Sequence, residues 1–397
     1  DILYFMHIDT PLLFRPMPLR GLTLPNRLVL APMMQYRAEN GFATDWHLAH
    51  YGKFALGGFG TVMTEVVSVE EAGRITHGDL GLWSDEFIPG LKRVTDFIHS
   101  QGALAAIQIG HSGRKGSSQR VWDGGGPLTL ADAAHGEAPW SPRGPSDLSY
   151  GPDFPKPHAL TIPEIEELIV KFGEAVARAD RAGFDIVEIH GAHGYLISSF
   201  LSPVTNNRQD AYGGDLVRRM RFALDVTTAI RANWPSHKPL FFRISIEDGA
   251  GKEGWSLEDS LAIAPLLAKR GVDIVDCSSG GINGSPTVQN SIKGLGYQVP
   301  YAEQIKNAAG VPSMAVGLIL YPQQAEDIVQ SGQSDLIAVG RQALYDPFWP
   351  LHALQTLAPD AEFKHWNESS GWWLQRRANA LAKFGLAPSG APLPKTL

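Results

Sequence analysis

The stretch Phe184–His190, with the sequence FDIVEIH, gives the clearest indication of the fold class. It is rich in Ile and Val without a clear polar alternation, which is typical of a strand that is buried on both faces. The segment before it, 161–183, opens with a capping-box pattern and places apolar residues at helical spacing. An amphipathic helix that leads into a buried strand indicates a parallel α/β fold.

The same pattern recurs along the whole chain. Helical segments are expected at about 85–101, 216–233, 257–270, 301–309 and 322–332. Eight apolar runs read as buried strands: Arg27–Pro32, Gly60–Val66, Ala103–Gly110, Phe184–His190, Leu240–Ser245, Asp273–Ser278, Pro312–Gly317 and Asp335–Gly340. Eight strands with intervening helices favour a closed (β/α)8 TIM barrel over an open sheet. We therefore predict a single α/β barrel domain over residues 1–397.

Two stretches fall outside this repeat. The segment His111–Leu160, after the third strand, is long and rich in Gly, Pro, Ser and Trp. A connection of this length in a compact domain is usually a lid or a binding loop. The segment 367–397 follows the last barrel helix and carries Trp372 and Trp373. We interpret it as a C-terminal extension.

Composition excludes several classes of protein. The chain of 397 residues has a formal net charge of −7 and no basic block, which argues against nucleic acid as a partner. No apolar run reaches the roughly 18–20 residues that span a bilayer. Cys277 is the one cysteine, so the chain cannot form an internal disulfide or a cysteine-based metal cluster. Together with the absence of a signal-peptide pattern at the start, this predicts a cytoplasmic protein without a membrane partner.

The residues at the ends of the predicted strands are the candidates for function, because TIM-barrel active sites lie at the C-terminal ends of the strands. Gly317 ends the seventh strand, and Gly340 and Arg341 follow the eighth. This is the usual phosphate position in such barrels, where glycine lets backbone N–H groups approach an anion and arginine adds charge. The alternative is that the two glycines only permit tight turns.

His190, His193 and Tyr195 follow the fourth strand and are separated by small residues. Two imidazoles in one pocket can donate hydrogen bonds to a carbonyl oxygen, and a tyrosine can donate a proton. A zinc site and a purely structural role compete with this interpretation, and spacing alone does not separate the three. We expect Glu188 to point away from the histidines by strand alternation, which leaves a catalytic zinc without its third ligand.

Longer motifs around these residues resemble a known family. The stretches 190–203 (HGAHGYLISSFLSP), 206–214 (NNRQDAYGG) and 108–115 (QIGHSGRK) are similar to the old yellow enzyme family, and specifically to its thermophilic-like and xenobiotic-reductase-like subgroup. The resemblance extends over about 14–350. It implies that this chain is an FMN-dependent ene-reductase, with the flavin bound non-covalently at the mouth of the barrel.

The resemblance assigns a cofactor site. Gln108 would bind the pyrimidine edge of FMN, and Arg243 would lie near N1 and the C2 carbonyl, where a positive charge stabilises the reduced flavin. The alternative for Arg243 is an ion pair inside the barrel. The full set of implied FMN contacts is Pro32, Met33, Met34, Val66, Gln108, His190, Arg243, Gly317, Gly340 and Arg341.

The resemblance also implies the reaction. NADPH or NADH reduces FMN, which then transfers a hydride to Cβ of an activated alkene such as an α,β-unsaturated carbonyl compound. His190 and His193 would bind the carbonyl oxygen, and Tyr195 would protonate Cα. Tyr36 and Met34 would face the small-molecule substrate.

Three departures from the subgroup concern the other wall of the site and the tail. Methionine occupies position 34, where the subgroup typically has cysteine, and Val66 is larger than the usual residue. Ser370 stands before Gly371, where the subgroup often has an arginine that completes a neighbouring subunit's site. A homodimer or homotetramer with 367–397 at a subunit interface is the expectation.

Other functions are less compatible with the sequence. Dienoyl-CoA reductases and trimethylamine dehydrogenases share a similar barrel but need a four-cysteine cluster and further nucleotide domains. A flavin-storage protein would need the FMN contacts but no proton donor such as Tyr195. A metal-dependent barrel hydrolase would be colourless.

Overall fold

Eight parallel strands close into a barrel in the computed structural model, which describes residues 10–284 and 294–392. Each barrel strand pairs with the barrel strands before and after it in the chain, and the last strand pairs with the first. The strands are β3 (Leu28–Leu30), β4 (Thr61–Ser68), β5 (Leu104–Gly110), β8 (Ile186–Gly191), β9 (Leu240–Ser245), β10 (Ile274–Ser278), β11 (Ser313–Ala315) and β12 (Leu336–Val339). The predicted (β/α)8 barrel and all eight strand positions are confirmed.

Helices connect the strands on the outside of the barrel. They are α1 (Asp45–Leu56), α2 (Ile88–Ser100), α4 (Ile162–Arg181), α6 (Leu216–Asn233), α7 (Leu257–Lys269), α8 (Val299–Ala309) and α9 (Pro322–Gln330). The expected capping box opens α4, where the Thr161 side chain accepts from the Glu164 N–H. Helix α1 was not predicted. His47 and His50 are both buried within it, so its buried face does not read as an apolar stripe.

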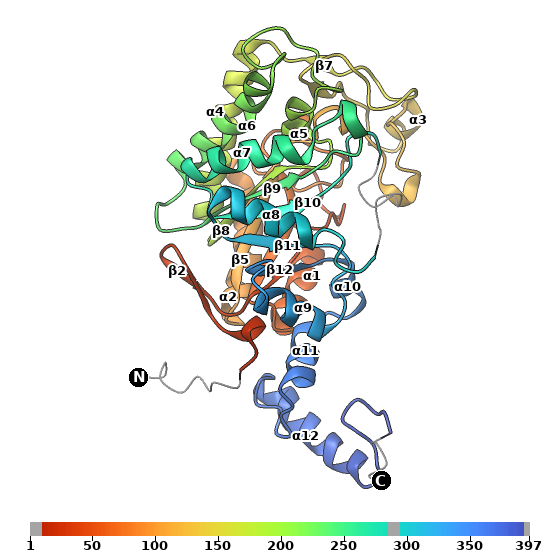
Figure 1. Ribbon diagram of the computed structural model, residues 1–397. Helices are drawn as coiled ribbons and strands as arrows, with labels where there is room; N and C mark the ends of the chain where they lie inside the picture. Colours follow the sequence, from red (N-terminus) through yellow and green to blue (C-terminus); the bar gives the residue numbers. More distant parts are fainter. Residues whose placement is uncertain (1–9, 285–293, 393–397) are drawn as a thin grey trace.

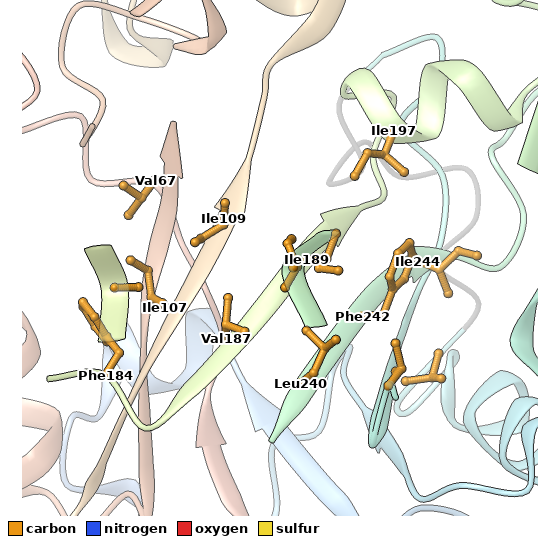
Figure 2. Packing of buried hydrophobic residues seen from close by; sticks show 14 of the residues in the cluster. Val67, Ile107, Ile109, Phe184, Val187, Ile189, Ile197, Leu240, Phe242 and Ile244 are labelled. Atoms are coloured by element: carbon orange, nitrogen blue, oxygen red, sulfur yellow. The ribbon is translucent and has the colours of Figure 1, made fainter. Parts of the chain in front are cut away.

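The strands bury two different faces. Residues that point outward pack between the sheet and the helices, as Figure 2 shows for Ile107, Val187 and Phe242. Residues that point inward begin with an apolar layer that includes Ile186 and Phe241. Full burial of such side chains stabilises the fold by roughly 1.5–3 kcal/mol each, so these two faces hold the barrel together.

A hairpin closes the N-terminal end of the barrel. Strands β1 (Met17–Leu19) and β2 (Leu22–Leu24) pair antiparallel before the first barrel strand. Met17, Leu19 and Leu24 belong to the same buried cluster as the inner apolar layer. The hairpin therefore adds to the inner apolar layer at this end of the barrel.

The predicted lid is partly ordered into short elements. It contains α3 (Leu130–Ala133) and a small parallel pair of strands, β6 (Arg143–Gly144) and β7 (His158–Ala159). After β8, a short helix α5 (Leu196–Leu201) packs against the start of the lid.

Within the described residues, the chain after the last barrel strand is largely helical. After β12 come α10 (Arg341–Tyr345), α11 (Trp349–Leu357) and α12 (Glu368–Ala382), and α12 projects from the end of the molecule opposite α5 (Figure 1). Trp372 and Trp373 are exposed on α12, and the Arg376 guanidinium stacks on the Trp372 ring. Its place at a subunit interface stays a prediction. Among the described helices, none has the length and hydropathy needed to cross a bilayer.

Candidate active site at the barrel mouth

One cavity of about 380 Å³ lies at the C-terminal ends of the barrel strands. Every residue that the sequence assigned to the site lines it: Pro32, Met33, Met34, Tyr36, Val66, Gln108, His190, His193, Tyr195, Arg243, Gly317, Gly340 and Arg341. The residues assigned from the sequence come from the ends of every barrel strand except β10. Strand β10 also reaches the cavity, through Ser278, which the sequence had not assigned to the site. Parallel strands place their carboxyl ends at one rim, and this is why positions so distant in sequence meet.

Sequence reasoning missed six lining residues. They are Ala31, Val121, Ser278, Tyr297, Gln298 and Val316. Ser278 ends β10 and could have been found from the same strand-end rule that located Gly317. Val121 comes from the lid, where nothing in the sequence marks one residue over its neighbours.

His190 is the last but one residue of β8 and is buried. The Ala192 N–H donates to its Nδ1 at 3.2 Å. A neutral imidazole carries one proton, so this contact assigns the proton to Nε2. His190 therefore offers an N–H donor at Nε2.

His193 is held in an unusual backbone conformation. Its φ is +63°, which L residues rarely adopt, and its N–H donates to the Ser245 hydroxyl at 2.9 Å. Nε2 of its ring lies 2.7 Å from the Ser278 hydroxyl. The Lys115 ammonium, at the start of the lid, donates to the His193 carbonyl at 2.8 Å. The lid therefore fixes the turn that carries His193, a role that the sequence did not reveal.

The two histidine rings are neutral. Burial lowers the pKa of both well below the ordinary value, and the positive charges of Arg243 and Lys115 lower them further. The ring centroids lie 5.2 Å apart with the planes nearly perpendicular. Two neutral imidazoles at this separation can donate to one acceptor atom between them.

Tyr195 follows the histidines and stays protonated. Its ring lies edge-on to His190 with centroids 4.9 Å apart. Burial raises its pKa, and the Asp79 carboxylate raises it further. Burial likewise raises the pKa of Tyr36, with Tyr195 as the next cause. Both phenols therefore carry their protons at neutral pH.

A small cavity of about 10 Å³ is lined by Tyr195, His190 and Asp79, among other residues. This is about the size of one water molecule. Asp79 accepts hydrogen bonds from the N–H groups of Ile75 and Thr76 at 2.6 and 3.2 Å. Burial nevertheless raises the pKa of Asp79 to about 7.

Glu188 corrects one expectation from the sequence. It does not point away from His190, because residues two apart on a strand share a face. It lies inside the barrel and accepts from the Gln108 amide at 2.8 Å. Within residues 10–284 and 294–392, no three His, Cys, Asp or Glu side chains are grouped so that they could hold a metal ion.

Arg243 makes the ion pair that the sequence analysis gave as its alternative. Its Nε lies 3.3 Å from a carboxylate oxygen of Asp276 on the next strand. The geometry does not make a hydrogen bond, and Nε is buried without a hydrogen-bond partner in the described part of the chain. Arg243 also lines the cavity, so the ion pair and a ligand contact are compatible.

The other side of the cavity fits an anion. Gly317 has φ +110°, and a Cβ there would lie 2.6 Å from the Gln298 amide nitrogen. The exposed Arg341 has no ion pair with any residue in the described ranges. Glycine backbone and a free guanidinium suit a phosphate, and Gln108 and Arg243 across the cavity suit the polar edge of a flavin. The residues present therefore fit FMN.

Comparison with known proteins points the same way. The model of the NADH:flavin oxidoreductase / NADH oxidase family matches residues 12–360. A protein of Listeria innocua serovar 6a named NADPH dehydrogenase is 40% identical over 353 residues, which cover 88% of this chain and 96% of that protein. The NADPH dehydrogenase of Listeria monocytogenes serotype 4a matches with the same identity and coverage.

Solved structures share the fold. A 2-naphthoyl-CoA reductase is similar with a TM-score of 0.78 and 26% identity over 89% of this chain, which spans 53% of that reductase. A morphinone reductase in complex with tetrahydroNAD superposes with a TM-score of 0.71 and 24% identity, covering 88% of this chain and 92% of its own.

Proposed function

Because the chain belongs to the NADH:flavin oxidoreductase / NADH oxidase family, we propose that it reduces activated alkenes, with a carbonyl-conjugated C=C bond as the substrate group. The protein is an oxidoreductase that acts on NAD(P)H and uses FMN. The observation that carries the proposal is the pair of neutral imidazoles of His190 and His193 at the cavity, with protonated Tyr195 beside them.

FMN would be held from both sides of the cavity. Bound FMN supplies hydride chemistry, accepting a hydride from NAD(P)H and giving one to the alkene. Gly317, Gly340 and Arg341 would bind its phosphate. Gln108 uses its amide N–H on Glu188, and this leaves the amide oxygen to accept from the pyrimidine edge.

His190 and His193 would bind the carbonyl oxygen of the substrate. Nε2–H of His190 is a free donor, because Nδ1 already accepts from Ala192. Two donors on one oxygen polarise the alkene and stabilise the enolate that develops as Cβ is reduced. Since both rings are held neutral, they bind the oxygen without giving up a proton.

Tyr195 would protonate Cα. The phenol is protonated in the resting state, and its ring packs edge-on against His190, which supports a role next to the carbonyl compound. Tyr36 lines the same cavity and would contact the substrate from the other side. Met34 would occupy the wall next to Tyr36, where its thioether fills space without donating a hydrogen bond.

A half-reaction experiment tests this assignment. The purified protein is expected to be yellow, to bleach with NADPH in the absence of oxygen, and to recover its colour when 2-cyclohexenone is added. Tyr195→Phe is expected to slow the recovery by about 10²–10⁴-fold, while bleaching by NADPH changes little.

Tyr36→Phe is the matched control, because it removes a second phenol from the same cavity. Slow recovery in Tyr36→Phe with normal recovery in Tyr195→Phe would exchange the two roles. A protein whose reduced flavin does not react with 2-cyclohexenone or N-methylmaleimide would contradict the proposed function itself.

A further inference from the structure

Four polar side chains form a layer inside the barrel, directly above its inner apolar layer. They are Gln108 on β5, Glu188 on β8, Arg243 on β9 and Asp276 on β10, four strands that are adjacent in the barrel. Strand register pairs Gln108 with Glu188, and Arg243 with Asp276. Gln108 and Arg243 line the cavity, whereas Glu188 and Asp276 have no exposed surface. The two acids therefore lie behind the two residues that face the cofactor site.

This polar layer, Gln108, Glu188, Arg243 and Asp276, is incompletely hydrogen-bonded. One Glu188 oxygen accepts from Gln108, but the other is buried without a partner in the described structure. Both Asp276 oxygens are buried in the same state, and Arg243 Nε approaches one of them at 3.3 Å without the alignment of a hydrogen bond. Buried carboxylate oxygens without partners are strongly unfavourable, so protons are expected on this pair.

The charges of the layer lead to the same expectation. Burial raises the pKa of Glu188 well above its ordinary value, and the Asp276 carboxylate raises it further. Burial also raises the pKa of Asp276, although Arg243 opposes this. The two acids share one guanidinium, that of Arg243. The other groups that face them are the neutral Gln108 amide and the neutral His190, which stands two residues after Glu188 on β8 and pairs with Arg243. One cation and one carboxylate balance when the pair holds one proton.

Reduction of the cofactor disturbs this balance. A hydride that enters FMN adds negative charge to the ring, and the positive group that lines the cavity on this side is Arg243. Arg243 then has two anions to neutralise, the reduced ring and the remaining carboxylate. Like charges near one another favour protonation of one of them.

We propose that Glu188 and Asp276 are a redox-linked proton store, which holds one proton when FMN is oxidised and takes up a second when FMN is reduced. The uptake leaves the Arg243 charge free to stabilise the reduced flavin. Both acids are positioning residues, since they act through Arg243 and Gln108 and do not touch the cofactor site themselves.

The step balances without a further reactant. NADPH gives a hydride to FMN and leaves as NADP⁺, and the flavin becomes an anion. One carboxylate of the pair accepts one proton from water and becomes a carboxylic acid. When the flavin later gives up its hydride, the acid returns its proton to solvent. Hydride transfer to FMN alone would take up no proton.

Proton uptake on reduction by NADPH is the direct test. The holoprotein is reduced by NADPH without oxygen in weakly buffered solution, and a pH-indicator dye reports the protons taken up per FMN. We expect uptake that approaches one proton in the wild type near neutral pH. Glu188→Gln and Asp276→Asn each leave one carboxylate beside Arg243 and are expected to keep the uptake, whereas the Glu188→Gln/Asp276→Asn double variant has no carboxylate to protonate and is expected to take up no proton.

Glu65→Gln is the matched control. Glu65 is also a fully buried carboxyl of a barrel strand, but it accepts from the Tyr51 hydroxyl and the Gln35 N–H and lies outside the polar layer. Its substitution should leave the proton count unchanged. The absorption spectrum of the reduced flavin, recorded in the same samples, distinguishes a proton on the protein from a proton on flavin N1.

A second measurement covers the case in which a variant does not bind FMN. The infrared difference spectrum of the reduced minus the oxidised wild-type protein should lose carboxylate bands and gain a protonated-carboxyl C=O band. No proton uptake by the wild type, uptake that persists in the double variant, or a difference spectrum without the C=O band would overturn the proposal. The experiment uses only the reaction with NADPH, so it does not depend on the proposed alkene substrate.

Discussion

Two layers inside the barrel differ in what their residues do, although they stand on the same strands. Phe241, Ile186 and Ile274 belong to the buried apolar layer. Two residues further along the same strands stand Arg243, Glu188 and Asp276. Residues two apart share a face and lie about 7 Å apart along the strand. The strand backbone is thus the same for both layers, and the side chains alone change a packed core into a charged site.

The apolar layer serves the stability of the fold, and the polar layer serves the site. The apolar layer holds one unpartnered hydroxyl in the described structure, that of Thr61 in register with Val29 and Leu104, whereas the polar layer holds several buried atoms of charged side chains without hydrogen bonds. Such atoms reduce stability unless a proton or a ligand satisfies them. The protein tolerates this at the end of the barrel where the cofactor binds.

The largest expected effect is in the apolar layer. Phe241→Ala should lower the free energy of unfolding by about 3–5 kcal/mol, because it removes a large buried side chain and leaves a cavity. Denaturant unfolding measures this. The folded fraction should retain its reaction with NADPH and 2-cyclohexenone. Loss of this chemistry with unchanged stability would contradict the separation of the two layers.

His193→Ala, at a residue above the polar layer, should have the opposite effect: it should slow the reaction and leave the free energy of unfolding almost unchanged. Removing one donor to a developing oxyanion typically lowers the rate by about 10²–10³-fold. Stopped-flow measurements should show this loss in the reoxidation of reduced flavin by 2-cyclohexenone, with a smaller change in reduction by NADPH. His352→Ala, at an exposed histidine of α11, serves as the control. Equal effects on both half-reactions would refute the carbonyl role.

Arg341→Ala extends the comparison to the rim of the barrel. Arg341 lines the cavity beside Gly317 and Gly340, so its loss should weaken FMN binding roughly 10- to 100-fold, the value of a charged hydrogen bond. Fluorescence titration of the FMN-free protein measures the change. Arg93→Ala removes an exposed arginine on α2 and should leave the affinity unchanged.

The smallest expected effect is on the free energy of unfolding, which the buried Glu188 of the polar layer lowers. The pKa of Glu188 is raised in the folded state, so the unfolded state loses this proton first as pH rises from about 4.3. The folded protein therefore loses stability with rising pH through this residue. Glu188→Gln should remove the loss and raise the unfolding free energy by about 1 kcal/mol near neutral pH, but not below pH ~4. A gain that is independent of pH would contradict this cause.

The sequence predicted the barrel well, because buried parallel strands leave a direct mark in composition. The run Phe184–His190 has that mark, and so have the seven others. Residues at strand ends could be assigned to the cavity for the same reason, since one topological rule brings them to one rim. Helix α1 was not predicted from the sequence because His47 and His50 occupy buried positions that are apolar in a typical amphipathic helix.

Contacts between distant segments could not be predicted. The ion pair of Arg243 with Asp276 depends on the register between β9 and β10, which no local pattern records. Lys115 reaches the carbonyl of His193 only because the lid folds back over the β8 turn. Glu188 is a different case, because strand alternation applied correctly would have placed it on the His190 face.

The fate of one labelled hydride shows whether this protein reduces the C=C bond of an enone. NADPH carrying deuterium at its transferred position is turned over with 2-cyclohexenone, and the product is analysed by NMR. We expect cyclohexanone with one deuterium at Cβ, because the label passes through FMN to the alkene while His190 and His193 hold the carbonyl oxygen. Deuterium at the carbonyl carbon of 2-cyclohexenol, or cyclohexanone without the label at Cβ, would contradict it.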